Sequence, residues 1–215
     1  KEALERQTAT AEILTVISRS PTDVQPVFDA ICERAMALSG ANIGGVTRFD
    51  GQWVHFAAFK GVSPEAEATM RAAFPMRLSR ASASSRAVLE GVPVEVPDVE
   101  KDPDYPLVTE SRLSGYRSIL AVPMLRDGQV IGAIAICRPE PGSFSRHLVE
   151  LVQTFADPAV IAIENVRLFR ELGARNADLT EALVHQTATS DVLRALSGSP
   201  PDVHTVLDII ALNAA

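Results

Sequence analysis

The chain has 215 residues and a formal net charge of −7, with 47% hydrophobic and 22% charged residues. This length is enough for one well-buried domain with additional helix, but it is short for two full domains. The sequence has no basic tract, and recognition of nucleic acid needs clustered Lys and Arg, so we expect no nucleic-acid partner.

The sequence contains no predicted secretory signal, and no apolar run approaches the roughly 20 residues that a membrane span needs. Its two cysteines, Cys32 and Cys137, are not part of a CxxC motif. They therefore predict neither a disulfide framework nor a zinc site. This cysteine usage fits a reducing compartment, and we expect a cytoplasmic protein.

Two helices are predicted at the beginning of the chain. Over residues 3–18, apolar side chains recur on one helical face, and Ser20-Pro21 interrupts the pattern. Thr22 or Asp23 is expected to cap a second amphipathic helix, which ends at Ser39-Gly40.

A hairpin and a third helix follow. Residues 43–49 and 53–59 are short predicted strands. Asp50-Gly51 joins them as a hairpin turn, because both residues tolerate positive φ. Ser63-Pro64 begins a predicted helix that ends near Phe74.

The region from residue 75 to 117 is less regular. A short helix is predicted over 85–90, and 93–96 is predicted to be an edge strand because its proline cannot donate a ladder hydrogen bond. The strongest predicted strands are 118–125 and 129–138, which are joined by a second hairpin turn.

Ser145 is expected to cap a long helix that continues to Leu168, with a kink at Pro158. The elements together predict an antiparallel sheet of about five or six strands, flanked by long helices at both chain ends. The expected fold class is therefore α+β.

An internal repeat is the most informative feature of the sequence. Ala3–Ala35 (ALERQTATAEILTVISRSPTDVQPVFDAICERA) matches Ala182–Ala214 (ALVHQTATSDVLRALSGSPPDVHTVLDIIALNA) without a gap, at an offset of 182 − 3 = 179 residues. Both segments contain QTAT and then S-x-S-P-x-D-V. The repeat predicts a tandem array with one unit per 179 residues, of which the chain holds one unit and the first two helices of the next.

We therefore expect three parts: a domain over residues 1–172, a linking helix over 173–197, and the beginning of a second domain over 198–215. A seven-residue pattern of apolar side chains, with polar interruptions, runs from about Asn165 to Leu196 and predicts a weak coiled coil. A helix packed on its own domain is the alternative interpretation. The apolar positions are Leu168, Leu172, Leu179, Ala182, Leu193 and Leu196, and the interruptions are Arg175, Gln186 and Thr189.

Two stretches resemble a known family. Gly115–Phe169 (GYRSILAVPMLRDGQVIGAIAICRPEPGSFS…ELVQTFADPAVIAIENVRLF) resembles the C-terminal half of a GAF domain, and Arg86–Val99 (RAVLEGVPVEVPDV) resembles its middle loop and strand. The opening motif is similar to units of bacterial sensors in which tandem GAF domains precede a histidine kinase or a nucleotide cyclase. The resemblance implies a six-stranded antiparallel sheet with a ligand pocket on one face and terminal helices on the other. It also implies homodimers through those helices.

The best-known ligand signatures of the family are missing. Cys137-Arg138 stands where cyclic-nucleotide-binding GAF domains have Asn-Lys, and the Asp-Glu expected after Phe144 is absent. Residues 79–117 contain no cysteine that could attach a bilin. GAF domains that reduce methionine sulfoxide use several cysteines, whereas Cys137 stands alone. His55 could coordinate haem, but a structural role for this histidine is the simpler interpretation. The sequence therefore identifies no cofactor. We also expect no metal site and no catalytic residues.

Residues 77–86 (RLSRASASSR) are the best candidate for ligand contact, because hydroxyls and backbone amides at a helix start bind anionic or carbonyl groups. Arg80 or Arg86 is suited to neutralise a carboxylate or phosphate. The alternative is a solvated loop with a helix cap at Ser84 or Ser85. The candidate ligand contacts, including those in parts that line the pocket in relatives, are Phe56, Phe59, Arg80, Ser82, Ser84, Arg86, Asp98, Tyr105, Tyr116 and Arg117.

The sequence thus predicts a non-catalytic sensory or regulatory domain. We expect it to bind a small ligand, or to relay a signal through dimeric helices to a downstream kinase or cyclase domain in the same chain. Two alternatives stay open: a structural dimerisation spacer without ligand, and a redox or light sensor that binds haem or a bilin.

Overall fold

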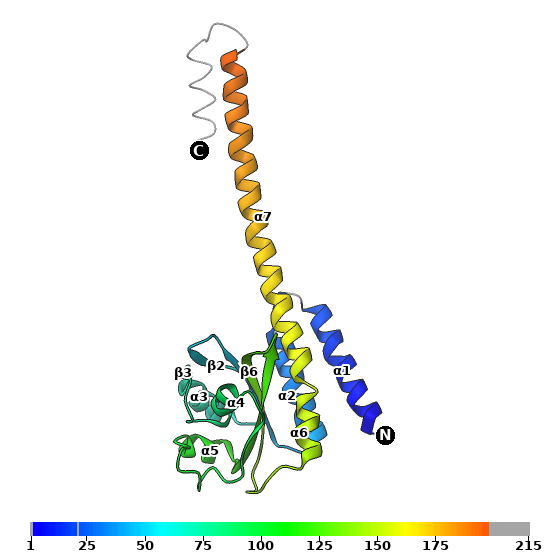
Figure 1. Ribbon diagram of the computed structural model, residues 1–215, viewed down its shortest axis with the longest axis vertical. Helices are drawn as coiled ribbons and strands as arrows, with labels where there is room; N and C mark the ends of the chain where they lie inside the picture. Colours follow the sequence, from blue (N-terminus) through cyan, green and yellow to red (C-terminus); the bar gives the residue numbers. More distant parts are fainter. Residues whose placement is uncertain (1, 21, 198–215) are drawn as a thin grey trace. The chain divides into compact units, whose positions relative to one another are not determined.

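The computed structural model describes residues 2–20 and 22–197 (Figure 1). The expected beginning of a second domain at 198–215 lies outside the described residues, as does the side chain of Leu196. The chain divides into two compact units, one through Val166 and one from Arg167 onward.

The first unit is built on one six-stranded sheet in which every neighbouring pair of strands is antiparallel. The order of the strands is β3-β2-β1-β6-β5-β4. The strands are β1 (Ile43–Phe49), β2 (Trp53–Lys60), β3 (Met76–Arg77), β4 (Val94–Val96), β5 (Ser118–Arg126) and β6 (Gln129–Arg138). The expected α+β class and six-stranded antiparallel sheet are confirmed.

Helices cover both faces of the sheet (Figure 1). One face carries α2 (Gln25–Ser39), α6 (Arg146–Gln153) and the first part of α7 (Ala156–Ser197), and α1 (Glu2–Arg19) packs against α2. The other face carries α3 (Pro64–Ala72), α4 (Ala83–Glu90) and α5 (Val108–Ser114). Helix α5 and the two-residue strand β3 were not expected from the sequence.

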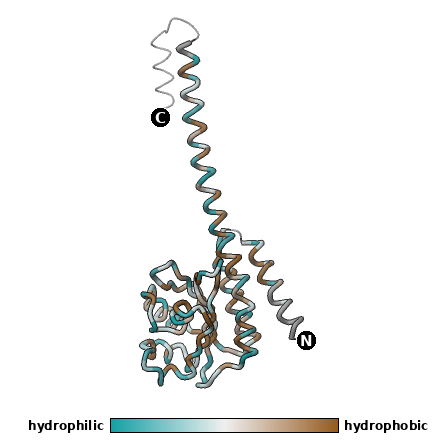
Figure 2. The backbone as a smooth tube through the Cα atoms, viewed as in Figure 1, coloured by the Kyte–Doolittle hydropathy of each residue, from teal (hydrophilic) through white to brown (hydrophobic). Residues whose placement is uncertain are grey.

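The central strands are apolar on both faces because both faces are covered. In β5, Leu120 and Val122 point into the core beneath the long helices, whereas Ile119 and Ala121 point into the core beneath α3, α4 and α5. Figure 2 shows the sheet coloured mainly as hydrophobic. The sheet therefore separates two hydrophobic cores, and each central strand touches both of them.

The expectation of one kinked helix after Ser145 is wrong, because the chain forms two helices there. The Ser145 hydroxyl caps α6 by accepting the Leu148 N–H, as expected. Helix α6 ends at Gln153, Phe155 is fully buried, and α7 begins at Ala156. Pro158 thus lies in the first turn of α7, where its missing N–H has no helical partner to lose.

The second unit is described from Arg167 through Ser197, where it is a continuous helix. Its large apolar side chains are exposed; Leu172 and Leu179, for example, are each 61% exposed. Glu171 pairs with Arg167 and Arg175, one turn away on each side. Among the helices of the described residues, none has the length and apolar character needed to cross a membrane.

Candidate functional site

A cavity of about 40 Å³ lies in the core beneath α3, α4 and α5. It is lined by six of the ten candidate ligand contacts, namely Phe56, Phe59, Ser82, Ser84, Tyr105 and Tyr116. The remaining wall is mostly apolar, with Met70, Phe74, Leu107 and Ile119 among its side chains. Sequence reasoning missed these residues, because an apolar side chain that lines a small cavity has the same pattern as one in a filled core.

A β-bulge brings two aromatic side chains to the cavity. Residues three apart in a regular strand point to opposite faces, yet Phe56 and Phe59 both lie in the core that holds the cavity. The register between β1 and β2 shifts between Val46 and Thr47, which leaves Ala57 as the extra residue. The two phenyl rings are in edge contact, with centroids 5.6 Å apart.

Helix α4 contributes hydroxyls to the wall. The Ser82 side chain caps the helix by accepting the Ser85 N–H at 3.1 Å, so the cap at Ser84 or Ser85 in the alternative interpretation is wrong. The reason is the backbone: Ser82 is extended, as a capping residue must be, whereas Ser84 and Ser85 are already helical. Ser84 is therefore left to line the cavity.

Two tyrosines form part of the cavity wall. The hydroxyls of Tyr105 and Tyr116 are 2.9 Å apart and hydrogen-bonded, and both side chains are buried. Burial raises the pKa of both phenols above the usual tyrosine value. It likewise raises the pKa of the Cys137 thiol, which also lines the cavity. All three groups therefore stay protonated and uncharged near neutral pH.

The segment that carries Tyr105 is held by a buried ion pair. Arg86 on α4 is 5% exposed and makes two hydrogen bonds to the Asp102 carboxylate, at 2.5 and 2.9 Å. The hydrogen bonds from Arg86 lower the pKa of Asp102. Asp102 also accepts the Asp104 N–H, and its carbonyl accepts the Tyr105 N–H. Arg86 thus fixes the turn that points Tyr105 into the cavity.

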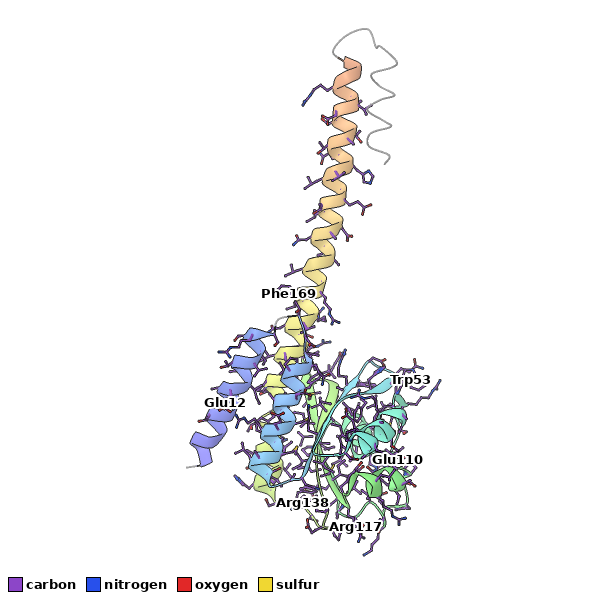
Figure 3. All side chains as sticks on the ribbon, turned by 180° about the vertical axis from the view of Figure 1, so that it is seen from behind. Glu12, Trp53, Glu110, Arg117, Arg138 and Phe169 are labelled. Atoms are coloured by element: carbon purple, nitrogen blue, oxygen red, sulfur yellow. The ribbon has the colours of Figure 1, made fainter. Side chains whose placement is uncertain are left out.

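None of the charged candidates, Arg80, Arg86, Asp98 and Arg117, lines the cavity. Arg117 lies at the end of the sheet, near Arg138 (Figure 3), and binds the Asp98 carboxylate at 2.7 Å. This hydrogen bond lowers the pKa of Asp98. Arg80 is exposed and pairs with Glu90 at 2.8 Å. The guanidinium groups suggested as ligand partners are therefore each paired with a carboxylate of this chain.

His55 is not among the residues that line the cavity. The His55 ring is exposed and lies 2.6 Å from the Asp50 carboxylate, within the hairpin of β1 and β2. Across residues 2–20 and 22–197, no group of three or more His, Cys, Asp or Glu side chains is placed to hold a metal ion.

A family model described as GAF domain matches residues 21–164. Free methionine-R-sulfoxide reductase from Neisseria meningitidis is 19% identical, with a TM-score of 0.59 over 78% of this chain and 93% of that chain. The GAF domain of an Acinetobacter phosphoenolpyruvate-protein phosphotransferase is 15% identical, with a TM-score of 0.59 over 77% of this chain and 97% of that chain.

A domain of a putative two-component sensor histidine kinase protein from Sinorhizobium meliloti is 16% identical, with a TM-score of 0.52 over 67% of this chain and 93% of that chain. No curated protein matches the chain. At these identities the solved structures show a shared fold, and the family model shows the family.

Proposed function

The chain belongs to the GAF domain family, and we propose that it is a non-catalytic sensory domain whose cavity binds a small ligand. The family is a sensory and regulatory fold of signalling proteins. The observation that carries the proposal is the cavity in which aromatic rings and hydroxyls converge from β2, α4 and the Tyr105 segment. Such a combination of apolar wall and a few polar groups is typical of ligand sites.

The central strands offer a route from the cavity to the long helices. Ile119 lines the cavity, while its neighbour Leu120 packs beneath α2, α6 and α7. Because protein cores are close-packed, a ligand that shifts one face of β5 also shifts the other. We propose that ligand binding changes the packing of the helices in this way and biases an equilibrium between two arrangements.

A non-catalytic role is supported by the state of the two thiols. The pKa of Cys32 is raised to about 12, chiefly by burial, and that of Cys137 is raised further by burial. A protonated thiol is a poor nucleophile. The cysteines also lie in different cores, on opposite faces of the sheet, which is no arrangement for an exchanging pair.

Native mass spectrometry of protein purified from its native host tests ligand binding. We expect one reproducible small-molecule adduct per chain. The variant Ala135→Val is expected to reduce the adduct strongly, because two added methyl groups occupy the cavity that Ala135 lines. Ala133→Val is the matched control, since Ala133 lies on the same face of β6 without lining the cavity. A protein free of any adduct would favour the structural spacer, and a visible absorption band would favour haem or bilin.

We further propose that the chain forms a homodimer through its helices and that residues 173–197 relay the signal to a kinase or cyclase domain downstream. The support is the exposed apolar row on α7, together with the sequence repeat at 182–214, which predicts a next unit. Polar Arg175, Gln186 and Thr189 make this row marginal as a coiled coil, which suits an element that switches between two states. A cytoplasmic location is proposed on the two unpaired, buried cysteines.

Replacing Leu179 with Asp is expected to weaken dimerisation by at least about 100-fold. Each dimer would lose two buried leucines, each of which contributes roughly 1.5–3 kcal/mol. Sedimentation equilibrium measures the change, and Thr180→Asp is the control, because Thr180 lies one residue off the apolar row. Equal dimer affinity in the two variants would remove α7 from the interface.

A further inference from the structure

The Tyr105–Tyr116 pair has a hydrogen-bond donor left over. Two hydroxyls supply two donor hydrogens, and the single bond between them uses one. Among the residues that the structure describes, none accepts the second hydrogen. Both tyrosines line the cavity, and a buried hydrogen-bond donor without an acceptor is unfavourable. An acceptor atom of a bound ligand can take this donor.

Ser84 adds a second hydroxyl of the same kind. Its side chain is buried, lines the cavity and makes no hydrogen bond to any described residue. The neighbouring Ser82 is committed as the cap of α4. The cavity thus combines a free donor at the tyrosine pair with a free hydroxyl at the start of α4.

No charged side chain lines the cavity among the described residues. The nearest candidates, Arg86 and Arg117, are each held by carboxylates of the chain. Burial keeps the Cys137 thiol and both phenols protonated. An anion in the cavity would therefore be a buried charge without a countercharge, which is strongly unfavourable.

We propose that the cavity takes an uncharged ligand, which presents a carbonyl-type oxygen to the tyrosine pair and Ser84 and an apolar remainder to Phe56 and Phe59. This inference rests on the proposed ligand-sensing function and adds the chemical class of the ligand. A cavity of about 40 Å³ holds only a few water-sized groups. A ligand that fits the cavity without rearrangement is therefore small.

Cyclopentanone and cyclopentanecarboxylate are matched probes, because they share a ring and differ in charge. Met70 lines the cavity, so its ¹³C-labelled methyl group reports binding by NMR, and Met124 in the opposite core is the internal reference. At pH 7 we expect the ketone to shift the Met70 signal saturably, and the carboxylate to bind at least about 100-fold more weakly.

The double variant Tyr105→Phe/Tyr116→Phe tests the hydroxyl pair. It removes both hydrogen-bonding groups together, so no buried partner is left unpaired and the fold is expected to persist. The ketone should bind this variant about 10-fold more weakly, while either single variant keeps one hydroxyl and should lose less. Unchanged ketone affinity in the double variant would overturn the role of the pair.

The outcomes separate this inference from the proposed function. Carboxylate binding as tight as ketone binding would overturn the uncharged class and leave ligand sensing intact. A Met70 signal that responds to neither probe would also overturn the inference. In that case the adduct seen by native mass spectrometry decides independently whether the domain binds a ligand.

Discussion

Replacing Asp102 with alanine is expected to destabilise the domain by roughly 3–5 kcal/mol, because it leaves the Arg86 guanidinium buried without its countercharge. Arg86 is 5% exposed, and the carboxylate binds two of its nitrogens. The variant also removes the acceptor for the Asp104 N–H, which shapes the turn before Tyr105. Urea unfolding measures the change as a lower transition midpoint.

Glu90→Ala is the matched control for this variant. It breaks the Arg80–Glu90 pair, which is also an arginine–carboxylate pair but has a single hydrogen bond of 2.8 Å and is solvent-exposed, so a loss of at most about 1 kcal/mol is expected. The double variant Arg86→Met/Asp102→Leu should recover most of the stability, because neither side chain then carries a buried charge. Similar losses for Asp102→Ala and Glu90→Ala would show that Arg86 reaches water in solution.

The sheet was predictable because its signals are local. The Asp50-Gly51 turn fixes the hairpin of β1 and β2, and the two strands that flank the turn lie where the sequence predicts them. The continuous apolar runs of β5 and β6 indicate strands covered on both faces, as the structure has them. Helix α5 was missed, since its seven residues VTESRLS show no apolar periodicity and their position depends on tertiary contacts.

The candidate site was predictable in position more than in chemistry. Family resemblance pointed to the residues, and the spacing of Phe56 and Phe59 gave no sign that a bulge puts both on one face. The partner of Arg86 lies 16 residues away, at Asp102, in a loop rich in acidic residues. A sequence cannot choose among such carboxylates, because the choice depends on how the loop folds back over α4.

Replacing Gly61 with alanine is expected to cost about 2–6 kcal/mol, through two separate effects. Gly61 has φ of +87°, a conformation that costs a residue with a side chain roughly 1–3 kcal/mol. An added Cβ would also lie 2.0 Å from the Asn42 carbonyl oxygen and 2.8 Å from the Met36 methyl group. Relieving that overlap requires backbone movement at the start of β1 and costs roughly 1–3 kcal/mol more.

Gly51→Ala separates the two effects. Gly51 has φ of +104° and nothing within 4 Å of an added Cβ, so this variant should lose only the stability that the positive φ costs an alanine. Urea unfolding should therefore show a distinctly larger loss for Gly61→Ala than for Gly51→Ala. Gly61 follows β2, so movement there also disturbs Phe59 and the cavity floor, and the Met70 methyl signal should shift in Gly61→Ala alone. Equal losses in both variants would mean that β1 does not approach Gly61 as closely as the structure shows.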